Sequence, residues 1–133
     1  MHASREALET YMQLGPLSIT DFEKEAKKNK VTVPTFDRET RIREWETETR
    51  IYEGQVLADS LEYHGILRII YRHGGIQEVC YESGLICGID RHIAADGSYT
   101  ISFRRRGKMH GVSRSYDVDG ELILETTHQN GRL

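Results

Sequence analysis

Residues 65–87 read GILRIIYRHGGIQEVCYESGLIC, and the same pattern returns in residues 88–110 (GIDRHIAADGSYTISFRRRGKMH) and in residues 111–133 (GVSRSYDVDGELILETTHQNGRL). Each copy begins at a glycine and is 23 residues long. A fixed period of this size is typical of repeat architectures, in which each unit is one supersecondary element that cannot bury its hydrophobic face alone. The sequence therefore predicts three repeats of one small element.

Each copy contains two stretches of alternating polar and apolar residues, and glycines punctuate the stretches. Dipeptides such as Asp96-Gly97 and Asp119-Gly120 supply the positive φ that tight hairpin turns require. The repeat is therefore predicted to be a β-hairpin. Nine glycines are predicted to be structural turn residues: Gly65, Gly74, Gly84, Gly88, Gly97, Gly107, Gly111, Gly120 and Gly131.

Equivalent residues of the first strand form columns across the three copies. Because side chains alternate between the two sides of a sheet, three of these columns share one face. The columns are Ile66, Ile89 and Val112; Arg68, Arg91 and Arg114; and Ile70, Ile93 and Tyr116. The arginine column has two interpretations. It either binds carboxylates or phosphates of a partner, or it covers the apolar columns with its stems and pairs with a glutamate or an aromatic ring.

These glycine-punctuated hairpins resemble MORN repeats, and most closely the variant repeats of bacterial proteins, some of which are antitoxins. Residues 111–133 carry the closest copy, and residues 50–64 resemble a degenerate half-repeat. The resemblance implies a mainly β protein, a twisted antiparallel sheet of hairpin repeats over residues 41–133. An extended repeat sheet offers a long surface for partners, so we expect a non-catalytic scaffold that binds proteins, or a structural subunit of a larger assembly. The resemblance alone implies an antitoxin or immunity-type inhibitor as an alternative.

Residues 1–40 are predicted to form a small cap of two helices and a linker. The first helix, over residues 4–14, starts at the N-cap Ser4 and places Leu8, Tyr11 and Met12 on one face. The second helix, over residues 19–28, has Ser18 as its candidate cap. An extended linker at residues 31–34 follows.

Residues 41–52 alternate with a period of two, which predicts one long, half-buried strand. Its inner face is predicted to carry Trp45, Thr47, Thr49 and Ile51, and its other face Glu44, Glu46, Glu48 and Arg50. Trp45 is either a binding anchor or the place where the two helices close over the first edge of the sheet. We expect the second, because terminal repeats need a cap.

Composition excludes several classes of protein. The chain has 133 residues, 38% of them hydrophobic, and a formal net charge of −3. Neither residues 1–64 nor residues 65–133 have the basic excess of a nucleic-acid-binding protein. The sequence shows no signal peptide and no apolar run long enough to span a membrane. With two cysteines, an intracellular and by default cytoplasmic protein is expected.

No arrangement of residues predicts catalysis, so we expect neither an enzyme nor a small-molecule substrate or cofactor. Phosphate loops, nucleophile elbows and zinc-protease motifs do not occur. His64, Cys87 and His110 share one column, but equivalent strands lie about 10 Å apart, twice the spacing between strands. Zinc ligands lie about 2.0–2.3 Å from the metal. We therefore expect no metal site there.

Two surfaces are candidates for partner contact. The first combines the arginine column with Val112, Tyr116 and Leu124 near the open edge of the last strand, where another protein or a second copy of the chain would bind. The second is a basic turn, a candidate for peripheral contact with anionic phospholipid. Its residues are Arg104, Arg105, Arg106 and Lys108.

Overall fold

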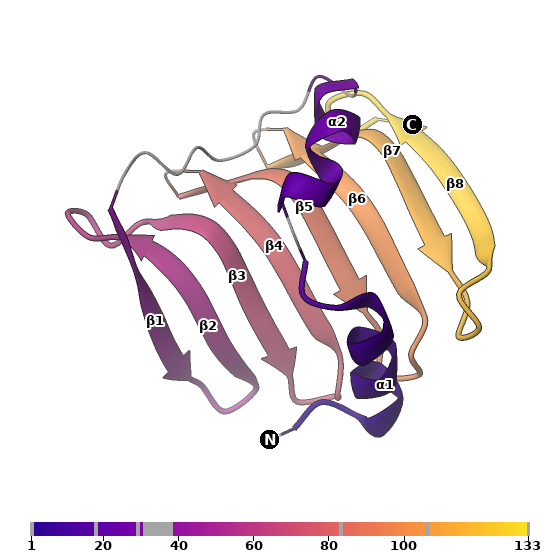
Figure 1. The fold of residues 1–133 in the computed structure, drawn as a ribbon, viewed down its shortest axis with the longest axis horizontal. Coiled ribbons are helices and arrows are strands. Elements are labelled where there is room, and N and C mark those ends of the chain that lie inside the picture. The colour runs from indigo at the N-terminus through magenta and orange to yellow at the C-terminus, as the bar shows by residue number, and fades with distance from the viewer. Residues whose placement is uncertain are drawn as a thin grey trace.

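The chain folds into one antiparallel sheet with two short helices on one of its sides (Figure 1). The structure, a computed structural model, describes residues 2–17, 19–28, 30, 39–82, 84–105 and 107–132. The helices are α1 (Arg5–Leu14) and α2 (Ile19–Lys28). The strands are β1 (Thr40–Glu46), β2 (Arg50–Leu57), β3 (Tyr63–Tyr71), β4 (Ile76–Glu82), β5 (Leu85–Ile93), β6 (Tyr99–Arg105), β7 (Lys108–Tyr116) and β8 (Leu122–His128).

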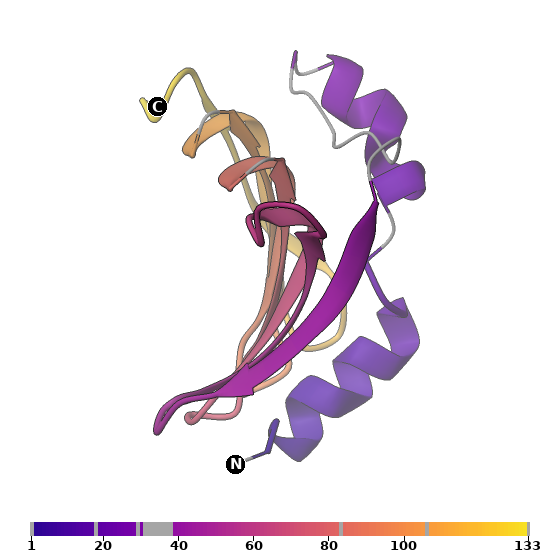
Figure 2. The same ribbon diagram turned by 90° about the vertical axis from the view of Figure 1, so that its left-hand side faces the viewer.

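The sheet confirms the prediction of a mainly β protein with antiparallel strands. Its strand order is the chain order, β1 to β8, so the strands form four consecutive hairpins. We call β1–β2 hairpin 1, β3–β4 hairpin 2, β5–β6 hairpin 3 and β7–β8 hairpin 4. The sheet is open and ends at β1 on one side and at β8 on the other. Figure 2 shows both helices on one side of the bent sheet, which we call the helix face; the other side is the second face.

Hairpins 2, 3 and 4 turn in the same way. In hairpin 3 the Gly97 amide donates to the Ala94 carbonyl (2.9 Å), and the Ala94 amide donates to the Ser98 carbonyl (2.8 Å). Corresponding bonds close the turns at Gly74 and Gly120, and all three glycines have φ between 83° and 99°. This is the three-residue hairpin loop in which one residue takes the left-handed conformation that glycine adopts without strain.

The links between hairpins repeat as well. Gly84 and Gly107 donate their amides to the carbonyls of Tyr63 and Ile86, at 2.9 and 3.0 Å. The donors and the acceptors are each 23 residues apart, which is the period of the sequence. In the last copy, Gly131 donates to Met109 (2.8 Å), so the donor comes one residue later.

Three of the nine predicted turn glycines lie inside strands instead, and that part of the prediction is wrong. Gly65, Gly88 and Gly111 belong to β3, β5 and β7 and have φ between 86° and 112°. At each of them the pairing with the preceding hairpin shifts register. The glycine supplies the positive φ of a β-bulge, which bends the strand, and therefore it is not a turn residue.

The predicted single strand over residues 41–52 is also wrong. It is two strands, because Thr47 closes a turn: its amide donates to the Arg50 carbonyl (2.8 Å), and its hydroxyl accepts from the Arg50 amide (3.1 Å). A threonine side chain thus takes the place of the glycine that marks the other turns. The predicted half-repeat at 50–64 is therefore part of a complete hairpin, hairpin 1, which begins at Thr40.

Helix α1 confirms the predicted bounds but not the predicted buried face. Ser4 caps it by accepting the Ala7 amide (3.0 Å), and Gly15 ends it. Ala7 is fully buried against β4 and β5, whereas Leu8 and Met12 are exposed. Only a small side chain fits between α1 and the sheet, because the helix lies close to it. The N-cap Ser4 is next to the hairpin turn at Gly74, and Glu6 and Thr10 of α1 are next to the turn at Gly97.

Helix α2 has the predicted bounds, whereas Ser18 and the linker at residues 31–34 lie outside the described residues. Leu17 and Ala26 pack on Cys80, Ile89 and Phe103 in the largest core cluster. The helices therefore cover the middle of the sheet, β4 to β6. The prediction that they cover its first strands near Trp45 is wrong.

Candidate interaction surfaces

The arginine column is placed on the helix face, where its members pair with glutamates of the same chain. At its centre lies Glu78 of β4, only 1% exposed. Its carboxylate accepts from Arg91 (4% exposed), from Arg68 (3.0 Å) and from the Leu17 amide (3.1 Å). Arg91 also donates to the Gly15 carbonyl (2.7 Å). A buried carboxylate is tolerated when it is paired and hydrogen-bonded in this way.

This buried network attaches α1, and the residues Gly15 and Leu17 that follow it, to the sheet. The guanidinium groups of Arg68 and Arg91 lie 5.5 and 5.7 Å from the centre of the Tyr11 ring on α1, a cation–π arrangement. Burial alone lowers the pKa of Arg68, but its hydrogen bond to Glu78 and the charge of that glutamate raise the pKa overall. Burial, followed by the charge of Glu78, raises the pKa of Tyr11. Sequence reasoning missed Glu78, because charged residues are expected at the surface.

The third member of the column, Arg114 of β7, forms ion pairs with two elements. It donates to Glu25 of α2, and its Nε lies 3.6 Å from Glu125 of β8. Although burial lowers the pKa of Arg114, the hydrogen bond and charge of Glu25 raise it overall. All three arginines therefore have glutamate partners within the chain, which favours the structural interpretation of the column. Contact of these arginines with another molecule stays a prediction.

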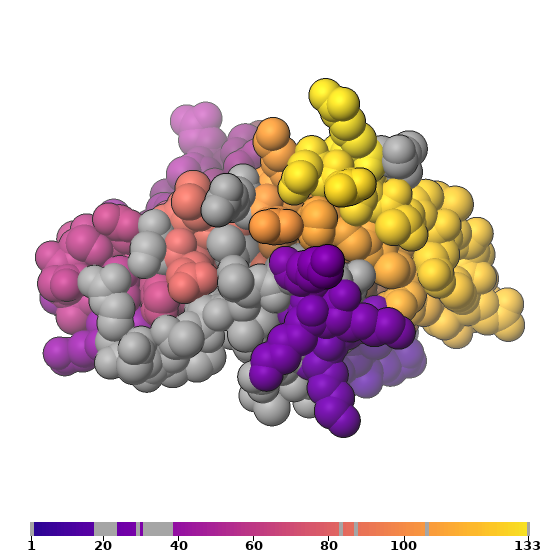
Figure 3. Space-filling model, turned by 90° about the horizontal axis from the view of Figure 1, so that it is seen from above, coloured from indigo at the N-terminus to yellow at the C-terminus, as the bar shows by residue number. Residues whose placement is uncertain are grey.

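Hairpin 4 extends past α2 (Figure 3). Several of its apolar side chains are exposed. Val112 and Tyr116 on β7 are half-buried, and the Tyr116 ring stacks on Tyr99 of β6 with centroids 4.7 Å apart. On β8, Ile123 is 64% and Leu124 is 56% exposed. The predicted set thus divides into a packed part on β7 and an exposed part at the edge.

The predicted basic turn does not form one cluster. Arg104 points to the second face, where it donates to Asp90 (3.2 Å). Arg105 and Lys108 are exposed at the strand ends, and Arg106 lies outside the described residues. Lys108 also borders a polar hollow of 650 Å³ together with Arg132.

The second face carries a band of aromatic rings, and Trp45 belongs to it. The indole stacks on Tyr52 (centroids 4.8 Å apart) and on Tyr63 (5.6 Å). The helices lie on the opposite side, so Trp45 is not packed beneath them. Farther along this face, Gln77 donates to Asp90 (3.1 Å), and burial lowers the pKa of the neighbouring His92.

The residues considered for metal or redox chemistry have structural positions. His64 is buried at a bulge, and Cys80 is fully buried in the core beneath α2; the Cys87 side chain lies outside the described parts. Within the described ranges, no group of three or more histidine, cysteine or acidic side chains could hold a metal ion. In the same ranges no helix is long and apolar enough to cross a membrane.

One surface was not anticipated from the sequence. The helix face of β1, β2 and β3 lies beside the helices rather than beneath them (Figure 1). It contains a hollow of 350 Å³ whose lining includes Ile51, Ile70, Glu44, Glu46 and Glu53. Reading residues 41–52 as one strand hid this surface, because that reading placed Glu44 and Ile51 on opposite faces.

No known protein family matches the chain, and no curated protein matches it.

Proposed function

We propose that this chain is a non-catalytic, MORN-like repeat scaffold that binds another protein chain at hairpin 4. The observation that carries the proposal is the composition of the edge strand. Three consecutive residues of β8, Leu122, Ile123 and Leu124, are exposed, and β8 has only β7 as its neighbour among the described strands.

Edge strands of this kind are normally protected. Lysine, proline or a covering segment prevents the free backbone groups from pairing with another chain. The β8 sequence LILETTH contains neither lysine nor proline, and its one acidic residue, Glu125, lies beside Arg114. An extended segment of a partner could therefore add to the sheet as a ninth strand, with main-chain hydrogen bonds giving affinity and the leucines giving specificity.

Circular dichroism and sedimentation of two variants test this function. Leu124→Lys places a charge on the exposed strand without disturbing the core, so circular dichroism should be unchanged. We expect wild-type protein to sediment as a complex, either of copies of itself or with a co-purified chain, and Leu124→Lys to sediment as a monomer. Tyr116→Asp should act in the same direction, but its ring is stacked, so some loss of stability is expected too.

Leu85→Lys is the matched control. Leu85 is 58% exposed, close to the 56% of Leu124, but it lies at the start of an interior strand. The same substitution there should leave the complex intact. A wild-type protein that stays monomeric at every concentration and brings no partner, or a Leu124→Lys protein that associates like wild type, would contradict the proposal.

Two alternative functions use β8 or the basic residues at the strand ends. An antitoxin or immunity-type inhibitor would be a scaffold whose partner at β8 is a toxin, and the resemblance of the repeats supports it. Contact with anionic phospholipid would use Lys108 and Arg105 at the strand ends. We expect no binding to anionic vesicles beyond that to neutral ones; binding that weakens with added salt would favour the lipid alternative.

A further inference from the structure

One row of directly paired residues crosses the helix face from β1 to β8. Neighbours in the row are partners across adjacent strands, and their charges alternate through the centre of the sheet. The row is Glu44, Glu53, Arg68, Glu78, Arg91, Ile101, Arg114 and Glu125.

The row departs from its pattern at Glu44. Hairpins 2, 3 and 4 each have an arginine at this place of their first strand, whereas hairpin 1 has a glutamate directly opposite Glu53. Like charges in directly opposed positions destabilise a sheet. The Glu44 carboxylate has no hydrogen bond or ion pair in the described part of the chain, and Glu53 shares Arg68 (3.0 Å) with Glu78. This end of the row has an excess of negative charge.

Apolar side chains form the floor beside these carboxylates. Ile51 and Ile70 line the hollow of 350 Å³, and a second hollow of 200 Å³ on the same face adds Ile42 and Ile66. Glu53 and Arg68 line both hollows, so they form one continuous surface. Ile42 is 61% exposed, although its equivalents in hairpins 2 and 3 are half-buried and fully buried.

The width of this surface matches one helix. Three strands span about 10 Å, two inter-strand spacings, and a helix with its side chains is about 10–12 Å wide. On one side the surface borders α1, whose Tyr11 ring lies over Arg68. On the other side it ends at β1, the edge of the sheet. A helix placed here would continue the layer that α1 and α2 begin.

We infer that the helix face of β1, β2 and β3 binds an amphipathic helix of a partner protein, with an arginine or lysine of that helix placed between Glu44 and Glu53. The incoming cation would restore the alternation of the row, and the apolar side of the helix would cover Ile51 and Ile70. This surface lies at the opposite end of the sheet from β8, so the inference goes beyond the proposed function and does not depend on it.

The test uses two labelled synthetic peptides, each about five helical turns long. Both have leucine and alanine on one side; the first carries arginine along the border of that side, and the second carries glutamate. Fluorescence anisotropy measures binding to the intact protein, and methyl NMR of Ile51 and Ile70 locates it. We expect the arginine peptide to bind and to shift both methyl resonances, and the glutamate peptide not to bind.

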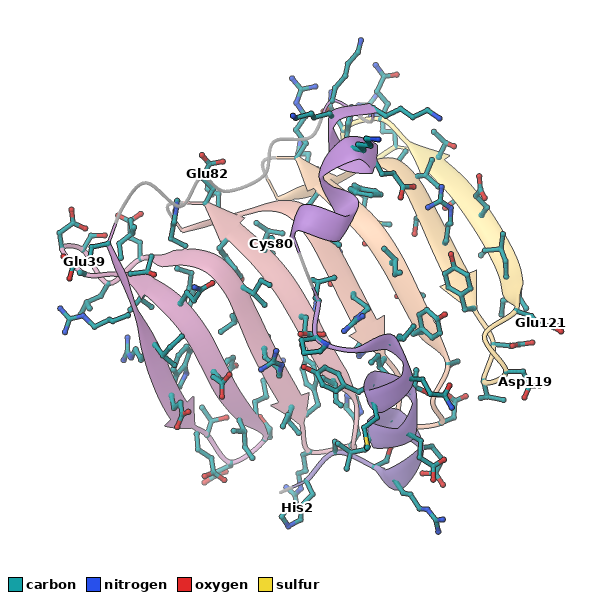
Figure 4. The ribbon with its side chains drawn as sticks, viewed as in Figure 1. His2, Glu39, Cys80, Glu82, Asp119 and Glu121 are labelled. Carbon is teal, nitrogen blue, oxygen red and sulfur yellow. The ribbon has the colours of Figure 1, made fainter. Side chains whose placement is uncertain are left out.

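Two substitutions of Glu44 and one control substitution elsewhere test the role of this carboxylate. Glu44→Gln should weaken binding of the arginine peptide about fivefold, the size expected for one exposed ion pair. Glu44→Arg should abolish binding and, in the protein alone, raise the denaturation midpoint, because it removes the like-charge pair. Glu121→Gln, at the exposed tip of hairpin 4 (Figure 4), is the matched control and should bind as wild type does.

Several outcomes would overturn the inference. They are no binding of the arginine peptide at millimolar concentration, equal binding of both peptides, unchanged Ile51 and Ile70 resonances, or full affinity of Glu44→Arg. Because Leu124→Lys lies at the other end of the sheet, it should bind the arginine peptide normally. Its result therefore separates failure of this inference from failure of the proposed function.

Discussion

Hairpins 3 and 4 are consecutive copies of one repeat, yet they have different surroundings. In hairpin 3, Ile89, Ile93 and Phe103 are at most 1% exposed beneath the helices. In hairpin 4, Val112 and Tyr116 occupy the places of Ile89 and Ile93 but are only half-buried. The hydrophobic pattern predicts each hairpin. The position of the helices decides which strands have their helix face covered.

The difference begins at the hairpin turns. Thr10 of α1 donates to the Gly97 carbonyl (2.7 Å), and the Ser4 amide donates to the Gly74 carbonyl (2.9 Å). The equivalent turn of hairpin 4, at Gly120, has nothing within 4 Å of the place a side chain would take. Figure 4 shows Asp119 and Glu121 beside it, pointing away from α1. The covered strands, β4 to β6, thus belong to the two hairpins whose turns contact α1 or its N-cap Ser4.

The largest expected difference is in the stability lost when a glutamate of the charged row is replaced at the covered centre of the sheet or in hairpin 4. Glu78→Gln removes the carboxylate that two arginines share and leaves the buried Arg91 without its partner. We expect a loss of about 3–5 kcal/mol in the free energy of unfolding, measured by urea denaturation. Glu125→Gln makes the same change in hairpin 4, where the side chain is half exposed, and should cost less than about 1 kcal/mol. Equal losses would mean that the central network does not hold the helices.

A smaller difference, in the thermal midpoint, is expected between alanine substitutions at the turns of hairpins 3 and 4. Alanine at Gly97 or at Gly120 is strained by about 1–2 kcal/mol, because both positions have positive φ. At Gly97 the added methyl also lies 3.1 Å from the Glu6 carbonyl and 3.0 Å from the Thr10 hydroxyl, so α1 must move. We therefore expect Gly97→Ala to lower the thermal midpoint more than Gly120→Ala. The reverse order would contradict the contact between α1 and this turn.

The smallest expected effect is a dependence of stability on pH, caused by a histidine of hairpin 3. His92 of hairpin 3 corresponds to Ser115 of hairpin 4, and burial lowers the pKa of His92 below its ordinary value of 6.5, with a further contribution from His73, while Asp90 opposes both. Between the lowered pKa and 6.5 the unfolded chain binds more protons than the folded one, so stability falls as pH falls through this window. Urea midpoints across the window should show this slope in the wild type and a shallower one in His92→Gln. An identical slope would assign the effect to other groups.

The sequence predicted the local elements better than their arrangement. The bounds of both helices follow from local signals such as the Ser4 cap and Gly15, and the strands of hairpins 2 to 4 follow from alternation and glycine turns. The turn at Thr47 was missed because a hydroxyl replaces the glycine signal. The bulges at Gly65, Gly88 and Gly111 were taken for turns because both structures need the same positive φ.

The candidate surfaces depended on tertiary contacts that no local pattern shows. The arginine column was visible in the sequence, but its partner Glu78 lies on the next strand and became evident only from the register. The position of the helices was wrong because it depends on how closely Ala7 and Ala26 approach the sheet. The strand at Leu124 was predicted to stay uncovered, and Leu124 is 56% exposed.

Residue-resolved hydrogen exchange on the dilute, monomeric protein tests the central claim most directly, namely that the helices protect hairpin 3 and leave hairpin 4 open. Amides of β5 and β6 should exchange only through global unfolding, whereas the outward-facing amides of β8 should exchange many times faster. The fast amides of β8 should become protected when a partner chain binds. Equal protection of β6 and β8 in the monomer would contradict the account.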